Sequence, residues 1–236
     1  MKLTDVVMAA LMRGVTNVLC RVHEEGLASI PMRGPFILVA NHVNFLEIPV
    51  LYTYLQPRRV TTLAKAETWH NPFLALLFDA GGAIPLRRGQ ADVVAIRRAL
   101  AVLEAGDILA LAPEGTRSND GILQRGHPGI GLLALRSKAP LIPLAFHGSE
   151  QYRANLPRLR RTDFYIRVGE PFTVDAGGAR VRGVVRQQIV DEIMYEIASL
   201  LPPAYRGAYS DMTAKTQDYL RFLPGCGNES SSAAAA

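Results

Sequence analysis

The fold class that we expect for this chain follows from one short stretch, Gly34-Pro35-Phe36-Ile37-Leu38-Val39-Ala40-Asn41-His42. Residues 36–40 are all apolar and follow a Gly-Pro turn, which is typical of a strand buried on both faces of a sheet. Polar residues that can carry chemistry follow the strand directly. Because reactive groups gather at the carboxyl ends of strands in α/β sheets, the stretch also indicates where a site would lie.

On both sides of this stretch, segments with strand and helix patterns alternate along the chain. Most of the strand segments are short apolar runs, whereas 164–168 alternates polar and apolar residues like an edge strand. The helical segments end at glycine or proline. This alternation predicts an α/β layer fold. The expected strands are 36–40, 83–86, 108–112, 141–146 and 164–168, and the expected helices are 93–105, 130–137, 184–201 and one that opens at Asn71-Pro72 and ends at Gly81-Gly82.

The N-terminal segment is predicted to form an amphipathic helix that could pack on the core or lie on a lipid surface. Arg13 and Arg21 interrupt its apolar run, so no stretch there reaches the ~20 residues that span a bilayer. We expect residues 1–30 to hold this helix and its connection, 31–224 the main domain and 225–236 a disordered tail. The apolar face comprises Val7, Met8, Leu11, Met12, Val15, Val18, Leu19 and Val22.

The composition favours a partner with negative charge. The chain has 236 residues, and its 26 Lys+Arg exceed its 21 Asp+Glu by five. This balance is typical of proteins that bind phosphates, a membrane surface or nucleic acid. The only cysteines, Cys20 and Cys226, are too few for a disulfide framework or a cysteine-based zinc site.

The first polar segment, 41–47, carries His42 and, five residues later, Glu47. If the chain turns back between them, the carboxylate can hold one imidazole nitrogen and leave the other free as a general base. Asn44 and Glu47 also match a capping box, in which Glu47 would only cap a helix. The residues alone leave both interpretations open.

A second segment, 81–89, delivers Arg87 and Arg88 beside a glycine at the end of a predicted strand. Such a turn can bind an anion through arginine side chains and backbone amides, and Lys65 could add another positive charge. Arginines in this position can equally be solvated surface residues.

The third segment, 112–118, also follows a predicted strand and contains Glu114, Gly115, Thr116 and Arg117. The glycine allows a ligand to approach the backbone closely, and the charged residues offer an acceptor and several donors. On its own the segment could be a turn held by an ion pair.

Taken in order, these segments resemble the glycerolipid acyltransferase family typified by lysophosphatidate (1-acylglycerol-3-phosphate) acyltransferases. The family pattern is N-H-x-S-x-x-D, a strand ending in an Arg-Gly-like turn, P-E-G-T-R-S, and an apolar Pro-x-x-Pro strand. The corresponding stretches are 41–47, 82–89, 113–118 and 140–143, and 201–209 looks like the closing segment of the family. The resemblance covers about residues 30–150. It implies a single-domain glycerophosphate-acyltransferase-like fold with a mixed central sheet flanked by helices.

The first segment departs from the family pattern at two positions, because Glu47 replaces the usual Asp and Asn44 the usual Ser. Glutamate keeps the charge but is one methylene longer, so it can orient His42 only if the backbone or its rotamer compensates.

The resemblance implies transfer of a fatty acyl group to the sn-2 hydroxyl of 1-acyl-sn-glycerol-3-phosphate, giving phosphatidic acid. The donor would be acyl-CoA or acyl-ACP, with no further cofactor and no metal. His42 would act as general base and Glu47 as its partner. The residues implied in substrate binding are Lys65, Arg88, Glu114, Gly115, Thr116 and Arg117.

The implied partners are the lysophospholipid, the acyl thioester, acyl carrier protein as one donor, and the cytoplasmic face of a membrane, bound peripherally. Other acceptors stay open: another lysophospholipid, glycerol 3-phosphate or a lyso-aminolipid. A lipid-binding protein that grips phosphate without catalysis is the non-enzyme alternative. Binding of nucleic acid through Arg158, Arg160 and Arg161 is not expected, because no aromatic-interleaved motif accompanies them.

Overall fold

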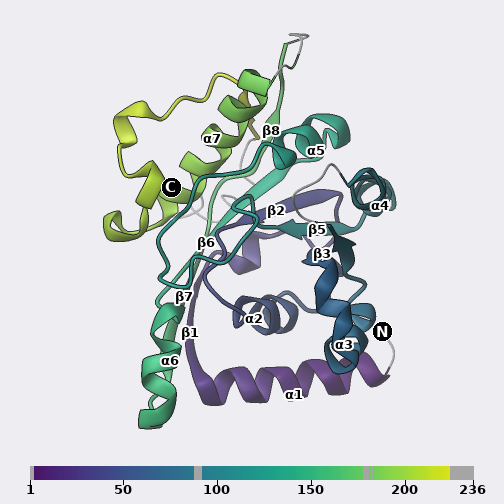
Figure 1. Ribbon diagram of the computed structural model, residues 1–236, viewed down its shortest axis with the longest axis vertical. Helices are drawn as coiled ribbons and strands as arrows, with labels where there is room; N and C mark the ends of the chain where they lie inside the picture. Colours follow the sequence, from purple (N-terminus) through teal and green to yellow (C-terminus); the bar gives the residue numbers. More distant parts are fainter. Residues whose placement is uncertain (1–2, 88–91, 178–180, 182, 224–236) are drawn as a thin grey trace, which may run out of the picture.

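The computed structural model describes residues 3–87, 92–177, 181 and 183–223 (Figure 1). Within these ranges the chain forms a nine-stranded sheet with the strand order β1-β7-β6-β2-β5-β3-β4, in which β8 pairs with β6 and β9 pairs with β8. The strands are β1 (Cys20–Glu25), β2 (Phe36–Ala40), β3 (Val60–Lys65), β4 (Ile84–Leu86), β5 (Ile108–Leu111), β6 (Leu141–His147), β7 (Thr162–Val168), β8 (Phe172–Val174) and β9 (Leu220–Phe222).

Helices cover both faces of the sheet (Figure 1). One face packs against α4, α5 and α7, and the other packs against α2, which in turn lies against α1. This arrangement confirms the predicted mixed α/β fold. The helices are α1 (Leu3–Leu19), α2 (Glu47–Tyr54), α3 (Pro72–Ala80), α4 (Val93–Glu104), α5 (Gly129–Ser137), α6 (Tyr152–Asn155) and α7 (Gly183–Leu200).

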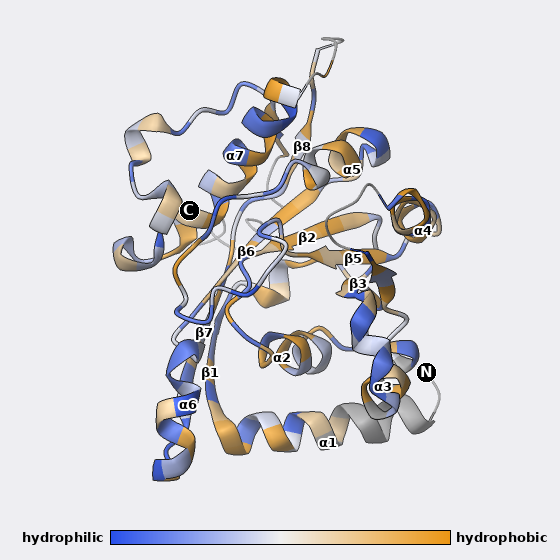
Figure 2. Ribbon diagram, viewed as in Figure 1, coloured by the Kyte–Doolittle hydropathy of each residue, from blue (hydrophilic) through white to orange (hydrophobic). Residues whose placement is uncertain are grey.

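Strand β2 lies at the centre of the sheet, as its apolar sequence predicts. All five of its residues are buried, between the parallel strands β5 and β6. Ile37 and Val39 pack toward α4, α5 and α7, whereas Leu38 packs toward α2. Figure 2 shows the same continuous hydrophobic band along β2 and β5. The central strand is therefore fixed by burial on both faces, and it holds the chain that follows it in place.

The N-terminal helix is shorter than the sequence predicts. It ends at Leu19, and Cys20–Glu25 forms β1, which pairs in parallel with β7. The prediction that Arg21 and Val22 belong to the helix is therefore wrong. Leu19 and Val22 are three residues apart and so fit a helical face, but from Cys20 onward the core-facing positions recur every second residue. Residues 224–236, which include the expected tail, lie outside the described residues.

Strand β7 is not an edge strand, because it lies between β1 and β6. Its alternation has a different cause: Phe164 and Ile166 are fully buried, while Tyr165 faces the solvent side of the sheet. Alternation of polar and apolar residues reports that one face of a strand is exposed, whatever the position of the strand in the sheet.

The segment after α7 is fastened to that helix by a buried carboxylate. Glu192, 1% exposed, accepts hydrogen bonds from the Thr216 hydroxyl at 2.8 Å and from the backbone N–H groups of Asp218 and Tyr219, both at 3.0 Å. These bonds bring β9 to its place beside β8. One buried carboxylate thus accepts three hydrogen bonds from this segment.

Replacing Glu192 with alanine should therefore destabilise the fold by about 2–4 kcal/mol, because three hydrogen bonds to a buried charged acceptor are lost. The control is Glu104→Ala, which removes an exposed carboxylate from α4 and should change stability by no more than about 0.5 kcal/mol. Urea unfolding of both variants measures the difference. Equal stabilities would show that the Glu192 bonds contribute nothing to the fold.

Candidate active site

The carboxyl ends of four parallel strands meet at one edge of the sheet. In the order β2, β5, β3, β4, these strands lead to His42, to Glu114, to Lys65 and to the Arg87 turn. The topology thus brings the three polar segments to the same edge, as parallel strands require. Arg88, which we expected to bind phosphate, lies outside the described residues.

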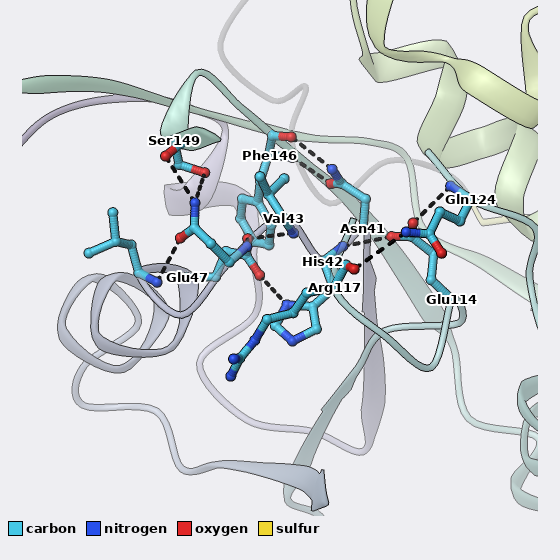
Figure 3. Close-up of polar contacts among 11 residues, drawn as sticks. Asn41, His42, Val43, Glu47, Glu114, Arg117, Gln124, Phe146 and Ser149 are labelled. Carbon is cyan, nitrogen blue, oxygen red and sulfur yellow. Dashed lines mark hydrogen bonds and ion pairs between the residues drawn. The ribbon is translucent and has the colours of Figure 1, made fainter. Parts of the chain in front are cut away.

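The imidazole of His42 is held by Glu47. The Nδ1 atom of His42 lies 2.5 Å from Oε2 of Glu47, whose side chain is buried (Figure 3). The other oxygen, Oε1, accepts hydrogen bonds from the backbone N–H groups of Val43 and Asn44, at 2.7 and 2.8 Å. One carboxylate oxygen thus closes the turn and the other contacts the histidine. The expected capping box is wrong, because α2 begins at Glu47 with Leu46 at its N-cap, so Glu47 closes the turn before the helix and does not cap the helix.

This contact defines which imidazole nitrogen is available for chemistry. An ionised carboxylate only accepts hydrogen bonds, so the proton shared with Glu47 belongs on Nδ1 of His42. Within the described residues, Nε2 forms no hydrogen bond. The His42 side chain is 18% exposed, so part of the imidazole can be reached from solvent.

Two asparagines anchor the turn that carries His42. Asn41 donates to the Phe146 carbonyl at 2.8 Å and accepts from its N–H at 2.7 Å, which ties the end of β2 to the end of β6. Asn44 donates to the carbonyl and hydroxyl oxygens of Ser149, at 2.9 and 3.1 Å. All of these side chains are buried. Sequence reasoning missed Ser149, since nothing local in the sequence pairs it with a residue 105 positions away.

Glu114 holds the same turn from the opposite side. Its Oε1 accepts from the His42 backbone N–H at 2.7 Å and its Oε2 from the Gln124 N–H at 2.8 Å (Figure 3). The pKa of the Glu114 carboxyl is raised to about 7. Burial is the largest cause of the rise and the nearby Glu47 charge adds to it, whereas the two hydrogen bonds lower the pKa and offset part of the rise. The geometry gives Glu114 a positioning role. Direct contact of this residue with a substrate stays a prediction.

The loop after Glu114 runs alongside the histidine turn. The N–H of Ser118 donates to the His42 carbonyl at 2.8 Å, and the N–H of Asn119 donates to the Val43 carbonyl at 2.9 Å. Gly115 has φ +66°, and a Cβ atom there would lie 2.9 Å from the His127 ring, so the position requires glycine.

The cationic side chains of the site are exposed. Arg117 extends from this loop toward the His42 imidazole (Figure 3), and Thr116 beside it is also exposed. Among the described residues no carboxylate pairs with Arg117. Lys65 lies 3.7 Å from Glu67, with both side chains about half exposed, so this ion pair is weak and easily exchanged for another anion.

A second layer of contacts supports the loop that carries Gln124. The Gly126 N–H donates to the Tyr209 hydroxyl at 3.1 Å, and that hydroxyl donates to Asp191 at 2.8 Å. Burial raises the pKa of Tyr209 above its usual value, so its hydroxyl stays protonated. Sequence analysis recognised 201–209 as a family segment but predicted no role for it. In the residues that the structure describes, no group of three or more His, Cys, Asp or Glu side chains could hold a metal ion.

The chain matches the family model described as Acyltransferase over residues 21–147, which is more than half of its length. It is 26% identical to the 1-acyl-sn-glycerol-3-phosphate acyltransferase of Bacillus subtilis over 121 residues, which cover 51% of this chain and 59% of that protein. It is 36% identical to the lyso-ornithine lipid O-acyltransferase of Pseudomonas aeruginosa over 114 residues, or 48% of this chain and 43% of that protein. The matched stretch thus spans about half the length of these relatives.

The fold is similar to the crystal structure of the 1-acyl-sn-glycerophosphate (LPA) acyltransferase, PlsC, from Thermotoga maritima. The two share a TM-score of 0.62 and 23% sequence identity, and the match covers 83% of this chain and 79% of that chain. This likeness establishes the fold.

The raised pKa of Glu114 predicts a pH-dependent stability. Because the pKa in the folded state is about 7 and the ordinary pKa of the group is 4.5, ionising Glu114 opposes folding. The stability that the protonated Glu114 carboxyl contributes is fully present below pH 4.5 and is lost as the pH rises through 7. Relative to Glu114→Gln, the wild type should lose about 3 kcal/mol of unfolding free energy across this interval. Urea unfolding at several pH values measures it, and a pH-independent difference would contradict the prediction.

Proposed function

The chain belongs to the acyltransferase family, and on this basis we propose that it transfers a fatty acyl group from a thioester to the sn-2 hydroxyl of 1-acyl-sn-glycerol-3-phosphate. The product is phosphatidic acid. The observation that carries the proposal is the contact of His42 Nδ1 with the buried Glu47 carboxylate, which leaves Nε2 as a base. The Bacillus relative, named for this activity, supports the same acceptor.

The proposed reaction is a direct transfer. Nε2 of His42 removes the proton of the acceptor hydroxyl while its oxygen attacks the thioester carbonyl carbon. The carbon–sulfur bond then breaks, and the imidazolium returns the proton to the leaving thiolate. Glu47 stabilises the imidazolium between these two steps. Acyl-CoA and acyl-ACP both fit this chemistry.

The exposed cations at the carboxyl edge would bind the acceptor phosphate. Arg117 offers a planar set of donors suited to phosphate oxygens, and Lys65 is held only by a weak ion pair. In this proposal Arg88 adds a third charge, Gly115 and Thr116 line the approach to the phosphate, and Glu114 fixes the backbone of His42.

A lyso-ornithine lipid is the second candidate acceptor, because the Pseudomonas relative named for that substrate shares the higher identity of 36%. An acceptor of this kind carries an amino-acid headgroup in place of the phosphate. It would use the same His42 chemistry, but it would not need the positive charge of Arg117.

We also propose that α1 binds the surface of a membrane. Its exposed side includes Val15 and Val18, which are 52% and 72% exposed. Its other side faces α2, where the Arg13 guanidinium lies 5.2 Å from the centre of the Tyr54 ring. None of the helices in the described ranges is long and apolar enough to cross a membrane. An amphipathic helix that turns valines outward is suited to an interface. The side chains of Val7, Met8 and Leu11 lie outside the description.

Replacing Glu47 with glutamine should lower turnover about 10³- to 10⁴-fold without unfolding the protein. The amide oxygen can still accept from the turn, but the amide nitrogen would donate to Nδ1 of His42 and move the imidazole proton to Nε2. Thiol release from acyl-CoA with lysophosphatidate measures the effect. Glu67→Gln, which removes an exposed carboxylate near the same edge, should keep wild-type turnover. Full turnover by Glu47→Gln would refute the proposed base.

Arg117→Gln distinguishes the two acceptors. With lysophosphatidate its KM should rise about 10- to 100-fold, because a charge-assisted bond to phosphate is lost. With lyso-ornithine lipid its KM should stay close to that of the wild type. Turnover of the wild type with only one of the two acceptors identifies the substrate. If neither supports acyl release from acyl-CoA or acyl-ACP, the proposed activity is wrong.

A further inference from the structure

A short arm, residues 152–161, projects from the end of the molecule where α1 lies (Figure 1). It consists of α6, the 3-10 turn Leu156–Arg158 and the three residues that return to β7. Leu159 at its tip is 95% exposed and has a left-handed backbone, with φ 51°. Leu156 is 51% exposed. One exposed leucine is ordinary on a protein surface, but two on a projecting arm, one of them in an unfavourable conformation, suggest a function.

The arm is also strongly basic. It contains four arginines, Arg153, Arg158, Arg160 and Arg161, and no acidic residue. Their contacts leave the charge unneutralised: Arg158 donates to the Ala154 carbonyl, and Arg161 donates to the Cys20 carbonyl at 2.7 Å. Among the described residues no carboxylate forms an ion pair with any of the four. Figure 2 shows the mixture of hydrophilic and hydrophobic residues along the arm.

The base of the arm lies beside both α1 and the catalytic turn. The Arg161–Cys20 bond joins it to the residue after α1. The Tyr152 ring packs edge-on against Phe45, with ring centres 5.1 Å apart, and Phe45 belongs to the turn between His42 and Glu47. An object bound at the arm would therefore lie close to the exposed valines of α1 and to the entrance of the site.

We propose that the arm is a second membrane-binding element, which places Leu156 and Leu159 at the interface of an anionic bilayer and binds lipid phosphates through Arg153, Arg158 and Arg160. Apolar tips flanked by arginines fit the boundary between headgroups and acyl chains. A nucleic acid fits less well, because the one aromatic ring of the arm is already packed against Phe45 and Arg153. The proposal extends the membrane binding proposed above, but it does not require catalysis.

The test is co-sedimentation of the purified full chain with vesicles of phosphatidylcholine alone or mixed with phosphatidylglycerol. The double variant Arg158→Gln/Arg160→Gln should bind the mixed vesicles about 25-fold more weakly, at about five-fold for each charge. Its control is Arg97→Gln/Arg98→Gln, which removes two exposed arginines from α4 and should bind like the wild type.

A second pair of variants tests the apolar tip. Leu159→Asn should weaken binding about tenfold, because leucine no longer enters the interface. Asparagine tolerates the left-handed conformation better than leucine, so the melting temperature should not fall. Val184→Asn, at a position 81% exposed on α7, is the matched control and should bind normally.

The outcomes separate this proposal from the proposed activity. Arm variants that bind mixed vesicles as tightly as their controls would overturn it, and so would loss of binding to an RNA or DNA oligonucleotide with vesicle binding intact. If the arm variants lose vesicle binding while the wild type transfers no acyl group, the membrane-binding role of the arm is supported and the proposed activity is wrong. If both proposals are correct, the arm variants should show lower turnover on a vesicle-embedded acceptor, in step with their weaker binding, and unchanged turnover on a monomeric short-chain acceptor.

Discussion

The candidate site depends on the division of one buried carboxylate between two tasks. Glu47 uses Oε1 to close the turn after β2 and Oε2 to hold the His42 imidazole. The backbone N–H groups of the turn fix the carboxylate, and the carboxylate fixes the imidazole ring. The turn and the His42 imidazole are therefore one structural unit. Glu47 stands where the family pattern has aspartate. Helix α2 begins at Glu47 itself, and its side chain reaches back over the turn to His42.

This unit is held from three sides by distant parts of the chain. Asn41 joins it to the end of β6, Asn44 joins it to Ser149, and Glu114 joins it to the loop of Gln124. Glu114 is expensive to bury as an anion, which is why its pKa rises, yet both of its oxygens accept backbone N–H groups. Such a buried group favours a single backbone arrangement, since any displacement of the turn would leave those donors unpaired. The rigidity of the turn thus comes from tertiary contacts.

The sequence predicts the parts of this architecture that depend on local patterns. The buried run of β2 and the polar residues after it are readable because burial on both faces and strand ends leave direct signatures. The boundary between α1 and β1 cannot be read from the sequence. Leu19 and Val22 are three residues apart, so they fit one face of a continuous helix as well as they fit the end of a helix followed by a strand. The inner position of β7 in the sheet cannot be predicted either, since alternation of polar and apolar residues indicates only that one face of a strand is exposed. Ser149 and Tyr209 reach the site only through the fold, and a single sequence holds no signal that pairs them with Asn44 and Gly126.

The position of the site relative to the molecular surface follows from the same contacts. Phe45 lies inside the turn between His42 and Glu47 and packs on Tyr152, while Asn44 next to it is bonded to Ser149, three residues before the arm. The proposed lipid acceptor would present its hydroxyl to His42 while its acyl chain stays out of water. Exposed valines on α1 and exposed leucines on the arm lie at the same end of the molecule, where they would shelter such a chain. The turn that holds the proposed base is therefore also the link between the proposed chemistry and the surface that would meet the lipid.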